Sequence, residues 1–208
     1  MAACAPPGIH PGSGGVARGR VSRSDPYLYP RSGVLRNKLG LRDEALLATM
    51  ERALVAQRIS EGAPSGDFDL DHRCAIHRHL FQDVYDWAGE VRRVELAKGG
   101  DQFQFRKFIP TGMADVHRRR ISANCLKGLD GPRFAREAAA IIGDINYIHP
   151  FREGNGRVQV QYLKLLAENA GRRLDLTMLD PARWLAASRA AHRGDYTLLA
   201  TEIGSASH

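Results

Sequence analysis

The sequence predicts an all-α fold, a helical bundle with one small β-hairpin. Apolar residues recur three or four positions apart, the spacing of one helix face, in most segments after residue 43. The alternation that is typical of strands occurs on the two sides of Gly99-Gly100-Asp101. The 208 residues are enough for one domain with a tail, and no internal repeat is visible.

The basic charge of the chain is concentrated in its first 42 residues. Seven Lys/Arg and one Asp lie there, which gives +6 of the net charge of +7, so the rest of the chain is nearly neutral. This distribution argues against direct nucleic-acid binding by the folded domain. Residues 1–24 are rich in Gly, Pro, Ser and Arg and lack an apolar pattern. We expect a disordered basic leader over 1–24 and the folded domain over 25–208.

Cysteine content and hydropathy favour a cytoplasmic protein. Cys4, Cys74 and Cys125 are odd in number and far apart, which favours neither a disulfide framework nor a zinc site. No apolar run is long enough for a membrane span, and the first twenty residues lack the apolar core of a secretory signal. We therefore expect a cytoplasmic location and no membrane partner.

Two helices are predicted after an irregular arm that begins at residue 25. Asp43 can cap a helix that runs to about Ser60. A second helix is expected from about Asp69 to the Trp87-Ala88-Gly89 stretch. The apolar stripes are Leu46, Leu47, Met50, Leu54 and Ile59 in the first helix, and Leu70, Ile76, Leu80, Phe81 and Val84 in the second.

A β-hairpin and a basic helix are predicted next. The strand-like run 91–98, the Gly-Gly-Asp turn and the alternating Phe103 and Phe105 indicate the hairpin. The run from Met113 to about Leu126 has helical spacing and several basic residues.

Proline and glycine mark the ends of the remaining helices. Pro132 occupies the favoured early position of a strongly apolar helix, which Pro150 ends. Gly154-Asn155-Gly156 is expected to form a turn, and a second apolar helix follows it and ends at Gly171. Two shorter helices are predicted over 181–191 and 196–203.

The turn between the two most apolar helices carries reactive side chains. Gly154 and Gly156 let backbone N–H groups face a ligand, and the helix that follows adds its positive dipole end, which suits a phosphate. Arg157 adds a guanidinium at the same place. Glu153 offers an oxygen ligand for Mg²⁺, and His149 can accept a proton near neutral pH.

Each of these residues also has an ordinary structural interpretation. A Gly-Asn-Gly segment commonly reverses the chain, a His beside Pro commonly caps a helix, and a Glu near a helix start interacts with the dipole. Together, however, they supply a base, a metal ligand, an anion site and a cation within nine residues. We interpret the segment 149–157 as a candidate active site.

This segment resembles the Fic family motif, His-x-Phe-x-(Asp/Glu)-Gly-Asn-Gly-Arg-x-x-Arg. The matching residues are His149, Phe151, Glu153, Gly154, Asn155, Gly156 and Arg157. The segments 27–30, 35–40, 76–89 and 193–196 also resemble the family, so the resemblance extends over about residues 27–203. It implies the Fic-fold helical bundle, in which the hairpin is a flap beside the site.

The resemblance implies a protein adenylyltransferase, or AMPylase, of the bacterial Fic/Doc superfamily. His149 would take the proton from a Tyr, Thr or Ser hydroxyl of a target protein, and the hydroxyl oxygen would attack the α-phosphorus of ATP. Glu153 would bind Mg²⁺, and Phe151 would only pack. The polyphosphate would be bound by Gly154, Asn155, Gly156 and Arg157.

The predicted flap has two implied roles. Its backbone would pair with the target segment by strand addition. In relatives it also lies near the nucleotide, which makes Lys98 and Gly99 nucleotide-binding candidates. An ordinary hairpin turn with a solvated lysine is the alternative interpretation of these two residues.

The chain departs from the motif at its last position, where Val160 replaces the second Arg. In relatives that Arg binds the terminal phosphate, and a charged hydrogen bond contributes about 1.5–3 kcal/mol. The chain is then an enzyme with weakened or altered nucleotide choice, a Fic enzyme that uses another nucleotide or phosphate donor, or a degenerate Fic-fold binding module. The intact His149, Glu153 and Gly-Asn-Gly favour retained activity.

The resemblance also implies partners. Many relatives are restrained by a helix with the pattern (Ser/Thr)-x-x-x-Glu-(Gly/Asn), and this sequence has no match to it. We therefore expect a small antitoxin that supplies an inhibitory helix in trans, as in the family's toxin–antitoxin pairs, with unrestrained activity as the alternative. Compact relatives modify type II topoisomerases, which makes such an enzyme the implied target.

Overall fold

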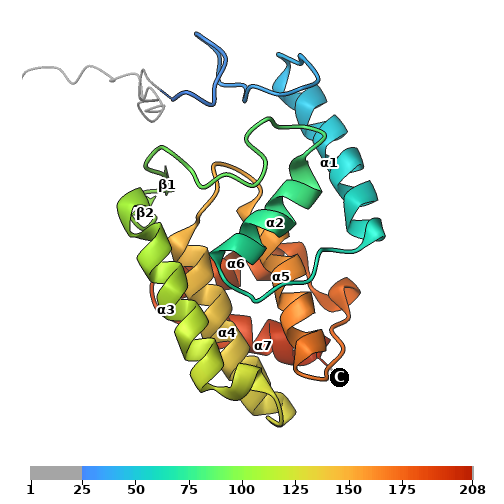
Figure 1. Cartoon of the computed structure of the whole chain (residues 1–208), viewed down its shortest axis with the longest axis vertical. Helices are drawn as coiled ribbons and strands as arrows, with labels where there is room; N and C mark the ends of the chain where they lie inside the picture. Colours follow the sequence, from blue (N-terminus) through green and yellow to red (C-terminus); the bar gives the residue numbers. More distant parts are fainter. Residues whose placement is uncertain (1–24, 208) are drawn as a thin grey trace, which may run out of the picture.

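The computed structural model describes residues 25–207, which form a helical bundle with one small hairpin (Figure 1). The predicted leader, 1–24, and His208 lie outside the described residues. The predicted all-α fold with a small hairpin is confirmed. The elements are α1 (Glu44–Glu61), α2 (Leu70–Phe81), β1 (Ala97–Lys98), β2 (Asp101–Gln102), α3 (Ile109–Ser122), α4 (Gly131–Ile148), α5 (Asn155–Asn169), α6 (Pro181–His192) and α7 (Thr197–Ala206).

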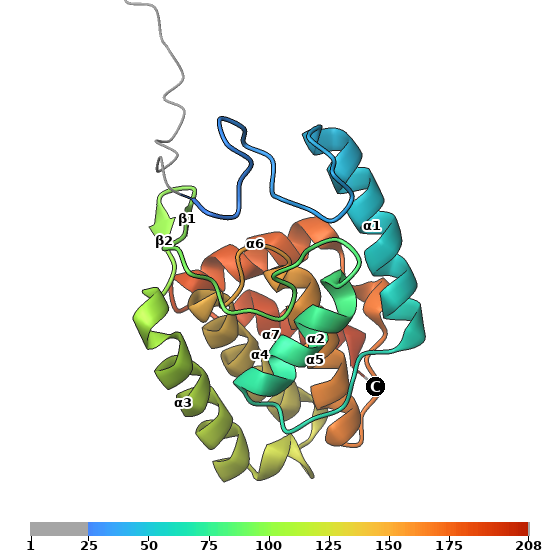
Figure 2. The same ribbon diagram turned by 45° about the horizontal axis from the view of Figure 1, so that its top comes forward.

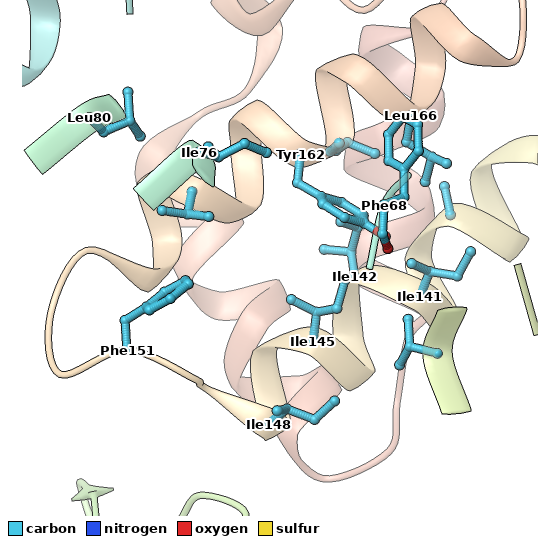
Figure 3. Packing of buried hydrophobic residues seen from close by; sticks show 14 of the residues in the cluster. Phe68, Ile76, Leu80, Ile141, Ile142, Ile145, Ile148, Phe151, Tyr162 and Leu166 are labelled. Carbon is cyan, nitrogen blue, oxygen red and sulfur yellow. The ribbon is translucent and has the colours of Figure 1, made fainter. Parts of the chain in front are cut away.

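Helix α4 is the centre of the bundle. Helices α3, α5, α6 and α7 pack against it, and α1 and α3 lie on opposite sides of the molecule (Figures 1 and 2). The apolar face of α4 is buried in a cluster that Phe151 joins from the following loop (Figure 3). Burial of each large aliphatic side chain contributes about 1.5–3 kcal/mol, so this face anchors α4 in the bundle. None of the helices within 25–207 has both the length and the apolar content that crossing a bilayer requires.

Aspartate side chains cap the N-termini of four of the helices within the described chain. Asp43, Asp69, Asp130 and Asp180 each accept a hydrogen bond from a backbone N–H in the first turn of α1, α2, α4 and α6. A cap of this kind contributes about 1 kcal/mol. Capping depends on neighbouring residues alone, which is why the predicted start of α1 is confirmed. The early position of Pro132 in α4 is confirmed for the same reason.

The predicted bounds of three helices are wrong. Helix α2 ends at Phe81 rather than near Trp87, because tight turns follow Phe81 and bury Trp87 against the core. Helix α3 already begins at Ile109, ahead of the predicted Met113, with a proline in its first turn. It ends at Ser122 rather than at about Leu126, and α7 ends at Ala206 rather than at Ile203.

The buried face of α1 also differs from the predicted one. Leu47, Glu51 and Val55 are buried, whereas Leu46 and Met50 are exposed. A carboxylate occupies the middle of this face because Glu51 is paired with a cation of α5. The apolar spacing alone could not predict this pairing.

The hairpin lies where the alternation predicted it, but its strands are shorter. Ala97 pairs with Gln102 and Lys98 with Asp101. The two glycines of the turn have φ of 61° and 91°, as a two-residue hairpin turn requires. Residues 91–96 are not in a strand, because their backbone groups bond to other segments, such as the N–H of Arg92 to the loop after α4.

Candidate active site

The loop between α4 and α5 has a strained backbone at His149. This residue ends α4 with φ 49° and ψ 61°, in the left-handed region that residues other than glycine rarely adopt. The conformation costs on the order of 1–2 kcal/mol and persists only where the surroundings fix it. Gly154 then precedes α5 with φ 79°, and a Cβ there would lie 2.3 Å from the Phe81 ring. Both the conformation and the packing at this position require glycine.

A pocket of about 780 Å³ opens at this loop, between α5, α6 and the hairpin. It is lined by every predicted site residue except Gly99: His149, Glu153, Gly154, Asn155, Gly156, Arg157 and Lys98. Another part of the lining is apolar and contains Val160 with Ile59, Leu176, Leu179, Trp184 and Leu185. The structure therefore brings the predicted base, carboxylate and anion-binding residues to one cavity.

The imidazole of His149 is neutral and has one nitrogen available as a base. Its Nδ1 lies 3.2 Å from the carbonyl oxygen of Asn146, which can only accept a hydrogen bond, so Nδ1 carries the proton. Nε2 then holds the free electron pair. The ring stacks on Phe103 of the hairpin with centroids 3.7 Å apart. Burial is the main cause that lowers the pKa of His149 to about 3; the hydrogen bond to Asn146 opposes this shift, and the nearby Arg92 charge adds to it.

Glu153 has a carboxylate oxygen available at the rim of the pocket. Its Oε1 accepts a hydrogen bond from the N–H of Gly154 at 2.8 Å, while Oε2 has no partner among the described residues. Mg²⁺ commonly uses one or two protein carboxylates and completes its shell with phosphate oxygens and water. Within 25–207 there is no group of three His, Cys, Asp or Glu side chains able to hold a metal alone. The donor set fits a magnesium ion that a phosphate ligand also holds.

The first turn of α5 faces the pocket as an open anion site. No side chain caps this helix, so its first backbone N–H groups remain available. A Cβ added to Gly156 would meet no atom within 4 Å, which means that the space beside this backbone is free. The positive end of the helix dipole lies at the same place. Both features suit a phosphate group.

The side chain of Asn155 closes the loop rather than facing a ligand. Its amide accepts a hydrogen bond from the N–H of Phe151 at 3.0 Å and donates one to the carbonyl of Phe151 at 2.8 Å. Asn155 is buried, and Phe151 has no exposed surface, as the packing role predicted for it requires. Only the backbone of Asn155 is left to contact a nucleotide.

Arg152 of the loop and Arg157 in the first turn of α5 are each ion-paired with a distant segment. Arg157 Nη1 lies 2.6 Å from Glu51 Oε1 of α1, and its guanidinium lies 4.6 Å from the centre of the Phe81 ring. Arg152 lies 2.9 Å from Asp25 in the arm before α1. These pairs fix the rim of the pocket from segments more than a hundred residues away in sequence.

Two buried residues that sequence reasoning missed support the loop. His77 of α2 lies 3.1 Å from the carbonyl oxygen of Glu153 through Nε2 and accepts the N–H of Gly89 at 2.7 Å through Nδ1. Its ring stacks on Phe151 with centroids 4.1 Å apart. The second residue, Arg92, donates to the carbonyl of His149. Neither residue stands at a spacing that would have indicated a role at the site.

Comparison with known proteins gives consistent matches. Residues 67–167 match the model of the Fic/DOC family. The chain is 38% identical over 180 residues to the probable protein adenylyltransferase y4lH of Sinorhizobium fredii, an alignment that covers 86% of this chain and 94% of y4lH. It is 35% identical to the protein adenylyltransferase VbhT of Bartonella schoenbuchensis over 86% of this chain and 38% of VbhT.

A solved structure has the same fold. The N-terminal Fic domain of a putative cell filamentation protein from Bartonella quintana, with bound ADP, superposes with a TM-score of 0.80 at 25% sequence identity. The superposition covers 88% of this chain and 94% of that domain.

Proposed function

The chain belongs to the Fic/DOC family, and we propose that it is a protein adenylyltransferase that moves AMP from ATP to a hydroxyl side chain of a target protein. The observation that carries the proposal is that one pocket holds both the His149 imidazole and the uncapped N-terminus of α5. We assign the activity to the domain over 25–208.

His149 is the proposed general base. Its unprotonated Nε2 takes the proton of the target hydroxyl, and the oxygen forms a bond to the α-phosphorus of ATP. The bond from that phosphorus to the oxygen bridging to the β-phosphate breaks, and pyrophosphate leaves with the electron pair. A positioned general base contributes about 10² to 10⁴ in rate.

The N-terminus of α5 is the proposed polyphosphate site. The backbone N–H groups of Asn155 and Gly156 and the guanidinium of Arg157 bind the phosphate oxygens there. Glu153 would hold Mg²⁺ through its free Oε2 at the pocket rim. When bound, the ion neutralises charge on the phosphates. Such chemistry depends mainly on positioning and charge neutralisation.

The hairpin is the proposed docking edge for the target. Ala97 and Lys98 of β1 are exposed, and β1 pairs with β2 on one side alone within the described residues. An extended target segment can add to the other side of β1, next to His149. Lys98 lines the pocket and has no ion pair with any residue that the structure describes, so its charge is available to a nucleotide. Gly99 lies outside the pocket lining, and we assign it to the turn.

The partners are proposals that rest on the family. We infer a type II topoisomerase as the target and a small antitoxin that blocks the pocket in trans, both acting in the bacterial cytoplasm. Val160 removes the family's second arginine, so such an antitoxin would act by filling space more than by pairing with a cation.

The test is label transfer in a bacterial lysate, with α-labelled and γ-labelled ATP compared. We expect a protein band labelled from α-labelled ATP with Mg²⁺, no band from γ-labelled ATP, and loss of the band in His149→Ala. Transfer of the γ-label would identify a kinase instead. A chain that binds ATP but labels no protein would identify a binding module.

A further inference from the structure

Arg92 is a buried guanidinium that connects the hairpin to the loop carrying His149. It is 2% exposed. Its Nε donates to the carbonyl oxygen of His149 at 2.8 Å, and its Nη1 donates to that of Val94 at 2.7 Å. Its Nη2 donates to the carbonyl of Gln104. One side chain therefore contacts the backbone of its own segment before β1 and of two other segments, one after β2 and one after α4.

Arg92 binds three consecutive carbonyls around the strained residue. Besides the His149 carbonyl, its Nη2 lies 3.4 Å from the carbonyl oxygen of Ile148, and its own backbone N–H donates to that of Pro150 at 2.9 Å. The Ile148 and His149 carbonyls belong to the two peptide groups that flank His149 and define its left-handed conformation, and the Arg92 guanidinium holds both through these hydrogen bonds. Without them, the loop could relax toward an ordinary conformation and turn the imidazole away.

Arg92 also fixes the aromatic ring that covers the imidazole. Val94 and Gln104 lie just before β1 and just after β2, so their bonds to Arg92 hold both ends of the hairpin. Phe103, next to Gln104, stacks on the His149 ring. The same guanidinium therefore determines the backbone of His149 and the position of its stacking partner.

We propose that Arg92 is a positioning residue for His149: it holds the general base in register with the α5 phosphate site without touching the substrate. The inference rests on the proposed adenylyl transfer. It predicts a specific kinetic effect, because Arg92 does not line the pocket and the α5 N-terminus is left intact. Loss of Arg92 should lower kcat and leave KM for ATP nearly unchanged.

The neighbouring Arg93 provides a matched control. Its side chain is 72% exposed, and its only ion pair within the described chain is with Glu90. For Arg92→Lys we expect a fall in kcat of about 10- to 100-fold, since small displacements of a catalytic group have effects of that size. KM for ATP should change by less than about twofold by the same argument. Arg93→Lys should match the wild type in both kcat and KM for ATP.

A spectroscopic readout tests the same inference without turnover. Stacking on Phe103 should shift the ring protons of His149 upfield, and the resonance is identified by its absence in His149→Ala. In Arg92→Lys and Arg92→Gln the shift should be lost, while Arg93→Lys should keep it. This measurement tests the role of Arg92 even if the wild type transfers no AMP. Absence of AMP transfer by the wild type would overturn only the proposed function.

Three results would overturn the role of Arg92. The first is a kcat of the Arg92 variants equal to that of the wild type, together with an unchanged chemical shift of the His149 ring protons. The second is an equal change in kcat and KM together with a lower Tm, which would indicate general loosening of the fold. The third is failure of both variants to fold, which would assign Arg92 to the fold rather than to His149.

Discussion

At the scale of single residues, the environment of His149 determines how it can act. Its Nδ1 proton is held by the carbonyl of Asn146, and its ring is covered by Phe103, so only Nε2 is left for chemistry. Burial makes the imidazole a weaker base than free histidine, but it also keeps it unprotonated over a wide pH range. In the proposed mechanism, proton transfer to His149 then depends on its position more than on its basicity.

The pH dependence of AMP transfer should reflect this burial. The active form of His149 is neutral, and activity is lost as pH falls through its pKa in the folded protein, which is about 3 rather than 6.5. We expect kcat/KM to stay constant from about pH 8 down to about pH 5. Initial rates at fixed ionic strength measure this, and an acidic limb centred at the ordinary histidine value would contradict it.

Val160 is the residue at which nucleotide choice can be altered. It lines the pocket one helical turn beyond Arg157 and has apolar neighbours there. In Val160→Arg the new cation should lower KM for ATP by about 10- to 100-fold, the equivalent of one charged hydrogen bond. The decrease in KM should be larger with ATP than with ADP as the donor. Val160→Leu is the control, and equal KM values in all three proteins would show that this position does not contact the phosphates.

At the scale of elements, two of the three buried polar residues of α2, His77 and Arg73, differ in how well their polar atoms are satisfied. His77 has a partner for each ring nitrogen and supports the loop after α4. Arg73 is fully buried, and all three of its guanidinium nitrogens lack a hydrogen-bond partner within the described chain. It contacts the faces of Tyr162 and Phe151 at 5.2 and 6.0 Å, which compensates for only part of the lost hydration.

Arg73→Met should stabilise the protein. Burial lowers the pKa of Arg73 to about 10, so at neutral pH the group is still charged and its desolvation opposes folding. An apolar side chain of similar length removes that cost, and we expect the free energy of unfolding to rise by about 1–3 kcal/mol. Urea unfolding measures the change. Arg78→Met, at an exposed position of the same helix, is the control. A lower free energy of unfolding in Arg73→Met would show that the guanidinium has a role of its own.

How far each element could be predicted depends on the range of its interactions. Asp43, Pro132 and Gly99-Gly100 act on their immediate neighbours, so the starts of α1 and α4 and the hairpin turn followed from sequence. The end of α2 and the buried face of α1 did not, because they depend on packing partners far along the chain. Glu51 can be buried because Arg157 pairs with one of its carboxylate oxygens and the Tyr85 hydroxyl donates a hydrogen bond to the other.

The same distinction applies to the candidate site. Residues 149–157 are contiguous, so their combination of base, carboxylate and glycines was visible in the sequence. The residues that hold them in place, such as Arg92, His77 and Glu51, come from three other segments and carry no common spacing. Their roles became visible only through the contacts in the fold.

At the scale of the whole molecule, the pocket is held together by segments that converge on one loop. The arm pairs through Asp25 with Arg152, α1 through Glu51 with Arg157, and α2 through His77 with the carbonyl of Glu153. The cavity is therefore a product of the complete fold, and its stability should follow that of the chain as a whole.

Acid should destabilise the fold through its buried histidines. His77 and His149 both have a pKa lowered to about 3 by burial, against 6.5 ordinarily, so the unfolded chain binds more protons below about pH 6.5. Their stabilising contribution is complete above that value and is lost as pH falls toward 3. From pH 7 to 5 we expect a loss of about 2–4 kcal/mol. Urea unfolding at both pH values measures this loss, and in His77→Gln the free energy of unfolding should depend less on pH. Equal stability of the wild type at pH 7 and pH 5 would contradict the prediction.

Gly156→Ala separates the proposed phosphate site from the stability of the fold. A Cβ at Gly156 meets no atom within 4 Å, and alanine favours a helix by about 0.5–1 kcal/mol over glycine. We expect an equal or higher Tm together with at least about tenfold weaker ATP binding by calorimetry, since the methyl group would occupy the space of a phosphate. Unchanged ATP affinity in a folded Gly156→Ala protein would contradict the assignment of the α5 N-terminus as the nucleotide site.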